Sequence, residues 1–463
     1  MALIMRQGSV KGDQEEKVRV QILAIIIACL SAITYGLLLA WTSPFMVKIT
    51  NDKTNYNITE DEASWLTYIS PIAMVVASTI FSYLSDKIGR KTTLMLTSIP
   101  HCISWICTIV STNIYVFYVS RIFSGIADGC LLVTLPVYIG EIAVPRIRGV
   151  WGNLVGVCTF FGVFLINVIG SQCSVNVTAY VCLPLPIVFV VAMCFLPETP
   201  YWCIMHGKDE RAKDSLRTLR GIQDVDGIFT KLKEEIDQQM KEKGTWRDLV
   251  MQPANRRGLI AGVFLRVSQL FGGAGALMTF TQYIFAGLKI DVPSEIPTIV
   301  FSGICFTLLI FTGNVIERVG KKKCYIITCF LNAIVQILEA VYFYYESEAP
   351  DVDVAGLKWF PIAGMVLYAV FSSFGSLVIP TVMLGELYST SIKAKAVCVL
   401  IITFGLVFSA SNFAFYYLNT RVGMYGPFLL FGITNIVSSL LSFNLMPETA
   451  GKTLEEIQVS LGK

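Results

Sequence analysis

The stretch Asp86-Lys87-Ile88-Gly89-Arg90-Lys91 follows an apolar span and returns in the second half of the chain as Glu317-Arg318-Val319-Gly320-Lys321-Lys322. Two further signals recur in the same order and at a nearly constant offset. Glu141 and Arg148 return as Glu386 and Lys393, and Pro197-Glu198-Thr199 returns as Pro447-Glu448-Thr449. Three signals repeated in one order indicate an internal duplication. In a membrane protein, two similar halves are typical of a transporter that rocks one half against the other.

The composition places the chain among membrane proteins. Of its 463 residues, 54% are hydrophobic and 15% are charged, and the mean hydropathy is +0.64; soluble proteins have about 25% charged residues. Twelve stretches are long enough to span a bilayer, which needs about 20 residues each. We therefore predict an all-α membrane protein with twelve transmembrane helices in two six-helix halves. The predicted parts are a cytoplasmic tail (1–20), a first half (21–196), a cytoplasmic helical linker (197–257), a second half (258–446) and a cytoplasmic tail (447–463).

The basic residues predict the orientation. Lys and Arg gather at one end of the predicted spans and in the 197–257 linker, so the positive-inside rule puts both termini in the cytoplasm, most simply beneath the plasma membrane. The acceptor motifs at Asn57 and Asn176 then lie outside, as glycosylation requires. Cys173 and Cys182 flank the external loop between the fifth and sixth spans. Either a disulfide or two free thiols fits them, and free thiols are the simpler expectation.

The repeated motifs carry a family resemblance. Besides the two charged cassettes, the chain has Leu135-Pro136-Val137-Tyr138-Ile139-Gly140-Glu141 at the end of the fourth span and Pro447-Glu448-Thr449 before a Gly-Lys-Thr-Leu-Glu-Glu run. In these motifs the chain resembles the sugar porter family of the major facilitator superfamily, most of all insect facilitated trehalose transporters. The resemblance implies the major facilitator fold and a facilitative transporter of a trehalose- or hexose-type solute that works by alternating access.

The resemblance also implies an intracellular gate. Opposite charges at the cytoplasmic helix ends can pair when that side closes and separate when it opens, and a pair matters only through its difference between the two states. The alternative is that these charges only set the membrane orientation. The expected gating residues are Asp86, Arg90, Arg121, Glu141, Arg148, Glu317, Lys321, Glu386 and Lys393.

The expected substrate site is incomplete. Amides suit sugar hydroxyls because they both donate and accept hydrogen bonds. Gln269 matches the first amide of the family's span-7 motif, but the second amide is Leu270 and the family's Asn is Gly275. Each lost hydrogen bond costs about 1 kcal/mol, so a conventional hexose should bind weakly unless other contacts compensate. The expected substrate-binding residues are Gln269, Asn412, Gln282 and Thr381; for Gln269 and Asn412 the alternative is polar contact between helices.

One residue is a candidate for coupling solute transport to protons. The first span has no Asp or Glu, where proton-coupled relatives have an acidic residue, and this favours passive transport. Asp128 in span 4 and Glu339 in span 9 are acidic residues at membrane depth, where ionisable groups are functional candidates. Asp128 is the possible coupling residue, although a structural partner is the simpler interpretation. We interpret His101 in span 3 as a polar contact and not as a proton relay.

The remaining expectations are negative or general. No set of residues has the spacing of a metal, nucleotide or nucleophile site, so we expect no cofactor, no metal and no enzymatic activity. The expected partners are a small-molecule solute, which the resemblance implies is a sugar, and the lipid bilayer, but no nucleic acid. Two other functions stay open: a solute sensor that does not transport, and a proton-coupled symporter.

Overall fold

The first half of the molecule is a helical bundle. The computed structural model describes residues 18–144, 147, 151, 153–241, 244–288, 290–348, 355–389, 392–449, 456–457 and 460–461, and regular structure in this part is helical throughout. The helices of the first half are α1 (Val18–Leu39), α2 (Thr42–Asn51), α3 (Glu60–Ser64), α4 (Leu66–Ile88), α5 (Arg90–Leu96), α6 (Ser98–Val110), α7 (Ile114–Ile142), α9 (Leu154–Gln172), α10 (Val175–Cys182) and α11 (Pro184–Cys194).

A linker and a second bundle follow. The linker helices are α12 (Pro200–Met205), α13 (Asp209–Arg220), α14 (Asp226–Lys241) and α15 (Trp246–Met251). The second half contains α16 (Pro253–Phe271), α17 (Ala274–Thr279), α18 (Thr281–Ala286), α19 (Glu295–Val319), α20 (Lys321–Glu348), the 3-10 turn η2 (Ala355–Leu357), α21 (Phe360–Phe374), α22 (Ile379–Met383), α23 (Lys393–Arg421) and α24 (Tyr425–Leu445).

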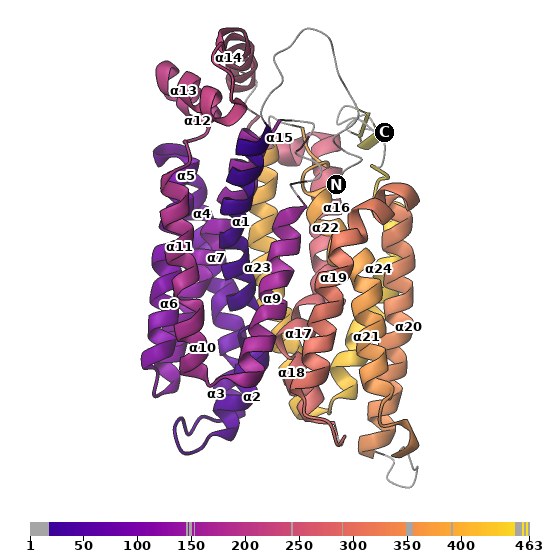
Figure 1. The fold of residues 1–463 in the computed structure, drawn as a ribbon. Helices are drawn as coiled ribbons and strands as arrows, with labels where there is room; N and C mark the ends of the chain where they lie inside the picture. Colours follow the sequence, from indigo (N-terminus) through magenta and orange to yellow (C-terminus); the bar gives the residue numbers. More distant parts are fainter. Residues whose placement is uncertain are drawn as a thin grey trace.

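The two ends of the bundle differ. The linker helices α12, α13 and α14 lie at the end where α4 and α11 finish, which we call the linker end (Figure 1). The short helices α2, α3 and α18 lie at the opposite end, which we call the far end. The linker is fixed to the first half, since Trp202 Nε1 donates to the carbonyl of Asp86 at 2.8 Å and the backbone N–H of Lys91 donates to Glu198 Oε1 at 2.9 Å.

Eleven described helical segments are long and apolar enough to cross a membrane. The remaining predicted span, 258–287, is the seventh along the chain, and it is divided into α16, α17 and α18. The break falls at Gly272-Gly273, where Gly273 has a φ of +97°, a conformation that glycine adopts without steric cost. The carbonyl of Gly272 is not left unpaired: it accepts from Gln336 Nε2 at 3.0 Å, Asn435 Nδ2 at 3.0 Å and Tyr368 OH at 3.3 Å. Three other helices thus hold the break in place.

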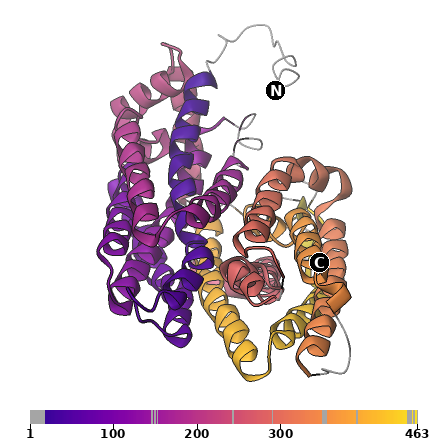
Figure 2. The same cartoon turned by 60° about the horizontal axis from the view of Figure 1, so that its bottom comes forward.

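The longest contacts between the halves are made by two pairs of helices, and α2 also contacts α18. Helix α4 packs against α23, and α9 packs against α19. Figure 2 shows the two bundles side by side, with α23 lying between them. The second contact is aromatic, because the ring of Phe306 lies 5.3 Å from that of Phe161 and 6.1 Å from that of Phe164. The predicted division into two helical halves is therefore confirmed.

The outer surface carries apolar side chains. Phe195 is 82% exposed, Leu440 62% and Ile80 58%. Such exposure would be costly in water over a large area, but it suits a surface covered by lipid chains. The predicted all-α membrane class agrees with this surface.

Candidate functional site

The first charged cassette forms a closed network at the linker end. Arg90 is 5% exposed, and its guanidinium reaches Asp86 Oδ1 at 3.0 Å and Glu141 Oε1 at 3.1 Å. It also donates to the carbonyl of Ser85 at 3.2 Å. The second carboxylate oxygen of Glu141 accepts from Thr199 Oγ1 at 2.5 Å. One arginine can bridge these groups because its five N–H donors form a planar fork.

The second cassette forms a smaller network. Lys321 Nζ lies 2.5 and 2.6 Å from the two carboxylate oxygens of Glu386. Glu317, the counterpart of Asp86, is exposed and forms no ion pair with the described residues. Lys321 lacks the planar fork of Arg90, and its ammonium contacts the carboxylate of Glu386. Lys393 donates to the carbonyl of Gly385 at 2.8 Å, and Arg148 lies outside the described residues.

The glutamates of the two Pro-Glu-Thr motifs hold the cassette turns. Glu198 accepts from the backbone N–H of Lys91 at 2.9 Å, at the start of α5. Glu448 accepts from the backbone N–H of Lys321 and of Lys322, both at 3.2 Å, at the start of α20. A carboxylate is favourable at a helix N-terminus, where backbone N–H groups are unpaired. The sequence showed the repeat of this motif but not that its carboxylate binds the other repeated motif.

Each turn needs its glycine. Gly89 has a φ of +108° and Gly320 a φ of +93°, which L side chains rarely adopt. A Cβ on Gly89 would lie 2.2 Å from Glu198 Oε2, and one on Gly320 would lie 3.0 Å from Glu448 Oε2. The glycines therefore permit both the turn and the close approach of the glutamate.

The prediction that Arg121 lies with the gating charges at the cytoplasmic helix ends is wrong. Arg121 lies in the second turn of α7, about 30 Å along the helix axis from Glu141, because span 4 runs from the far end to the linker end. It is 2% exposed, donates to the carbonyl of Leu38 at 3.0 Å and packs 4.5 Å from the ring of Trp41. Arg121 thus joins α7 to the end of α1 and has no contact with the network of Arg90.

At the far end, polar contacts join the two halves. The hydroxyl of Tyr283 donates to Glu60 Oε2 at 3.1 Å, and that of Tyr416 donates to Asp61 Oδ1 at 2.8 Å. Deeper along the same contact, Asn412 Nδ2 donates to the carbonyl of Thr67 at 3.2 Å. We call the contacts of Glu60, Asp61, Tyr283 and Tyr416 the far-end lock. Sequence reasoning missed the lock, since its members are separated by more than two hundred residues and share no motif.

The expected substrate-binding residues do not form one cluster. Gln269 is 5% exposed and lies on α16 beside Thr381 of α22, where Arg266 Nη1 donates to Gln269 Oε1 at 2.8 Å and to Thr381 Oγ1 at 3.3 Å. Gln282 lies on α18, and its backbone N–H donates to Ser43 Oγ of the first half at 3.4 Å. Asn412 is fully buried in the contact between α23 and α4. Arg266 was not singled out from the sequence, although a charged residue within a predicted span is a signal in itself.

Asp128 belongs to a buried group within the first half. Its Oδ1 lies 3.7 Å from His101 Nε2, and its Oδ2 lies 3.4 Å from the hydroxyls of Ser70 and Ser124. Both Asp128 and His101 are at most 3% exposed. The position brings α4, α6 and α7 together around one carboxyl group. These groups fit two roles, a structural contact between helices and a proton-binding pair.

The two glycosylation motifs lie in different environments. Asn57 is exposed and has a φ of 45° in the loop before α3. Asn176 lies within α10 and accepts from Tyr56 OH at 3.4 Å, and Thr178 of its motif is fully buried. Cys173 and Cys182 are not bonded to each other in the structure.

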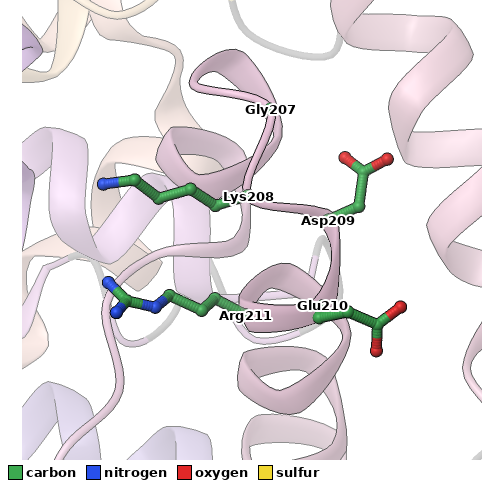
Figure 3. A pocket seen from close by; sticks show the side chains of 5 residues that line it. All are labelled: Gly207, Lys208, Asp209, Glu210 and Arg211. Atoms are coloured by element: carbon green, nitrogen blue, oxygen red, sulfur yellow. The ribbon is translucent and has the colours of Figure 1, made fainter.

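The linker carries a hollow lined by residues 207–211 (Figure 3). Lys208 and Arg211 point to one side of it, and Asp209 and Glu210 point to the other. The cations and carboxylates therefore do not converge on a common point. Lys208 packs 4.2 Å from the ring of Trp202, and Asp209 pairs with Lys233 at 2.6 Å. These contacts join the linker helices to one another.

Together, the duplicated halves, the apolar outer surface and the charge networks at matching turns define a multi-pass membrane transporter of the major facilitator type. Residues 23–461 match the model of the family described as "Sugar (and other) transporter", and the chain belongs to this family. It is a transporter and not an enzyme.

Similar proteins come from insects and bacteria. The chain is 29% identical over 443 residues to a facilitated trehalose transporter Tret1-2 homolog of Drosophila simulans, covering 95% of this chain and 90% of the relative. It is 29% identical over 445 residues to the facilitated trehalose transporter Tret1 of Polypedilum vanderplanki, covering 95% and 87%. The fold is similar to that of the proton:xylose symporter XylE bound to 6-bromo-6-deoxy-D-glucose (TM-score 0.77, 20% identity, 96% of this chain and 99% of that chain). It is equally similar to the inward open conformation of XylE from E. coli (TM-score 0.77, 19% identity, 94% and 99%).

Proposed function

We propose that this chain carries a sugar or sugar-like solute of the trehalose or hexose type by facilitated diffusion across the plasma membrane. The relatives named facilitated trehalose transporters support the solute class. The concentration of Lys and Arg at the linker end supports cytoplasmic termini and a cytoplasmic linker, by the positive-inside rule. The far end then faces the outside.

One observation carries the mechanism: the halves are bound to each other at the far end, whereas the described ion pairs at the linker end lie within one half each. Tyr283 and Tyr416 of the second half hold Glu60 and Asp61 of the first. Arg90 pairs within the first half and Lys321 within the second. This is the pattern of a state closed to the outside. Transport by alternating access requires the far-end lock to separate while the linker-end charges exchange partners.

The proposed solute contacts are Gln269, Gln282, Asn412 and Thr381. Gln269 and Thr381 lie together on either side of Arg266. Gln282 and Asn412 lie at contacts between the halves, so a solute that separates the halves would have these amides within reach. The proposed gate comprises Asp86, Arg90, Glu141, Glu317, Lys321, Glu386 and Lys393, with Arg148 as a further candidate.

A proton-coupled symporter is the second candidate, because His101 lies 3.7 Å from the buried carboxyl group of Asp128. Ionisable residues at membrane depth often relay protons. Against this, the first span has no acidic residue. Under passive transport Asp128 would serve only to pack α4, α6 and α7.

The test is uptake of a panel of sugars into vesicles that contain the purified protein, with and without a pH gradient. Saturable uptake that does not respond to the gradient is expected. Uptake driven by the gradient and abolished by Asp128→Asn would establish the symporter instead. Correctly folded protein that binds a sugar but takes up none would establish a sensor.

A further inference from the structure

Arg266 is a buried cation in the middle of the second half's first helix. It lies about 20 Å along the axis from the start of α16 at Pro253, and only 6% of its surface is exposed. Among the described residues, no carboxylate lies within ion-pair distance of its guanidinium. A buried charge without a counter-ion is expensive, so a charged side chain in this position needs an explanation.

The neighbours of Arg266 are neutral. Nη1 donates to Gln269 Oε1 at 2.8 Å and to Thr381 Oγ1 at 3.3 Å. The ring of Phe404 lies 5.0 Å from the guanidinium carbon, and such cation–π contacts compensate only in part for lost hydration. The Nε–H has no acceptor in the part of the chain that the structure describes. The side chain is therefore held in place by neutral contacts and keeps an unused donor and an unbalanced charge.

The site also faces the boundary between the halves. Tyr35 of α1, in the first half, and Tyr325 of α20 lie near Arg266, and a tyrosine hydroxyl is uncharged at neutral pH. Arg121 is buried and has unpaired donors as well, but it lies near the far end of α7, where it donates to the carbonyl of Leu38. Arg266 thus combines burial, an unpaired donor and neutral hydrogen-bond partners on α16 and α22.

We propose that Arg266, with Gln269 and Thr381, binds an anionic group of the transported solute, a carboxylate or a phosphate carried on a sugar frame. A guanidinium recognises both groups with two parallel hydrogen bonds, and the free Nε–H supplies one of them. Gln269 and Thr381 then orient the guanidinium and offer hydrogen bonds to the sugar hydroxyls. This inference rests on the proposed function, since it names the chemical class of the solute at the same site.

The test compares binding of D-glucose, D-glucuronate and D-glucose 6-phosphate to the purified full-length protein by calorimetry, and uptake of the same solutes into vesicles. We expect one or both anions to bind more tightly than glucose. Arg266→Gln should weaken anion binding about tenfold to a hundredfold and should weaken glucose binding by a clearly smaller factor, because Gln269 and Thr381 remain. Arg266→Lys keeps the charge but not the fork, so its effect on anion binding should be intermediate. Arg421→Gln, the same chemical change at the exposed end of α23, is the matched control and should change nothing.

The outcomes separate this inference from the proposed transport. Glucuronate binding without phosphate binding, or the reverse, identifies the anionic group. Anion binding that depends on Arg266 without uptake of any solute supports the inference and contradicts the transport proposal. Saturable glucose uptake with no preference for the anions supports transport and overturns the inference. Equal weakening of all three ligands in Arg266→Gln, with the thermal stability of the wild type, overturns it too and leaves Arg266 as a packing residue. If Arg266→Gln does not fold, an unchanged anion preference in Arg266→Lys overturns the bidentate site.

Discussion

The hydroxyl of Tyr416 donates a hydrogen bond of 2.8 Å to Asp61 Oδ1, and this contact joins the two halves of the transporter at the end opposite the linker. Tyr416 lies on α23 and is 8% exposed, whereas Asp61 lies in the short helix α3. The bond exists only while the halves are together at this end. It therefore contributes to the difference in free energy between the closed and the open far end, which is the quantity that controls alternating access.

Removing the tyrosine hydroxyls of the far-end lock should favour opening of this end. In Tyr416→Phe and Tyr283→Phe, each lost hydrogen bond should cost about 1 kcal/mol and shift the equilibrium about fivefold. Hydrogen exchange measured by mass spectrometry should increase in residues 60–68. Tyr180→Phe, at a 61% exposed position on α10, is the control. Unchanged exchange in the double variant would show that apolar packing of α4 on α23 holds this end closed without the lock.

The cassette glycines should differ in their sensitivity to substitution. Alanine at either position meets a backbone conformation that costs about 1–3 kcal/mol for a residue with a side chain. Gly89→Ala should destabilise more than Gly320→Ala, because its Cβ would lie 2.2 Å instead of 3.0 Å from a glutamate oxygen. Thermal unfolding in detergent measures both. Gly227→Ala, in a helix with no atom within 4 Å of the new Cβ, should be neutral, and an equal loss in all three would contradict the argument.

Glu339 should be replaceable by an apolar residue. It is fully buried, packs against Gly364, and neither carboxyl oxygen has a hydrogen-bond partner among the described residues. An unsatisfied buried polar group costs about 1–3 kcal/mol, so Glu339→Met, of similar volume, should raise the thermal stability. Leu338→Met, facing outward on the same helix, is the control. A fall in stability together with loss of uptake would reveal that the carboxyl group has a role in another state of the cycle.

Glycosylation should occur at Asn57 and not at Asn176. Asn57 lies in an exposed loop, whereas the motif of Asn176 is helical and its Thr178 is buried. In cells, Asn57→Gln should abolish the mass shift that a glycosidase removes, and Asn176→Gln should leave it intact. The same result would place the far end outside the cell. A shift that survives Asn57→Gln and disappears in Asn176→Gln would mean that the glycan is attached before α10 forms.

The fold could be predicted from the sequence because its strongest signals are local. The cassettes mark their own turns through Gly89 and Gly320, and span length follows from hydropathy. The break in span 7 was harder to see, since an apolar run of sufficient length hides a discontinuity whose only mark is Gly272-Gly273. The prediction for Arg121 failed because it assigned this residue to the cytoplasmic end of span 4, whereas the residue lies near the opposite end of that span.

The site was less predictable for physical reasons. Motif matching drew attention to Gln269 but not to Arg266, which has no counterpart in the motif. The contacts of Tyr283 and Tyr416 depend on how the halves are placed in one conformation, and no local pattern encodes that placement. The contact of Glu198 with the turn at Gly89 is a similar case. Both motifs can be recognised in the sequence, but the contact between them cannot.

The break at Gly272 has a consequence for how this chain can change over evolutionary time. Its acceptor is a main-chain carbonyl, which no point substitution removes, while the three donors Gln336, Tyr368 and Asn435 lie on other helices. The two glycines of the break cannot vary freely, since Gly273 has a φ of +97° and a Cβ on Gly272 would lie 2.6 Å from the carbonyl of Ser268. The break is therefore held by main-chain geometry and by donors from three other helices, without the amide that Leu270 replaces in the family's motif.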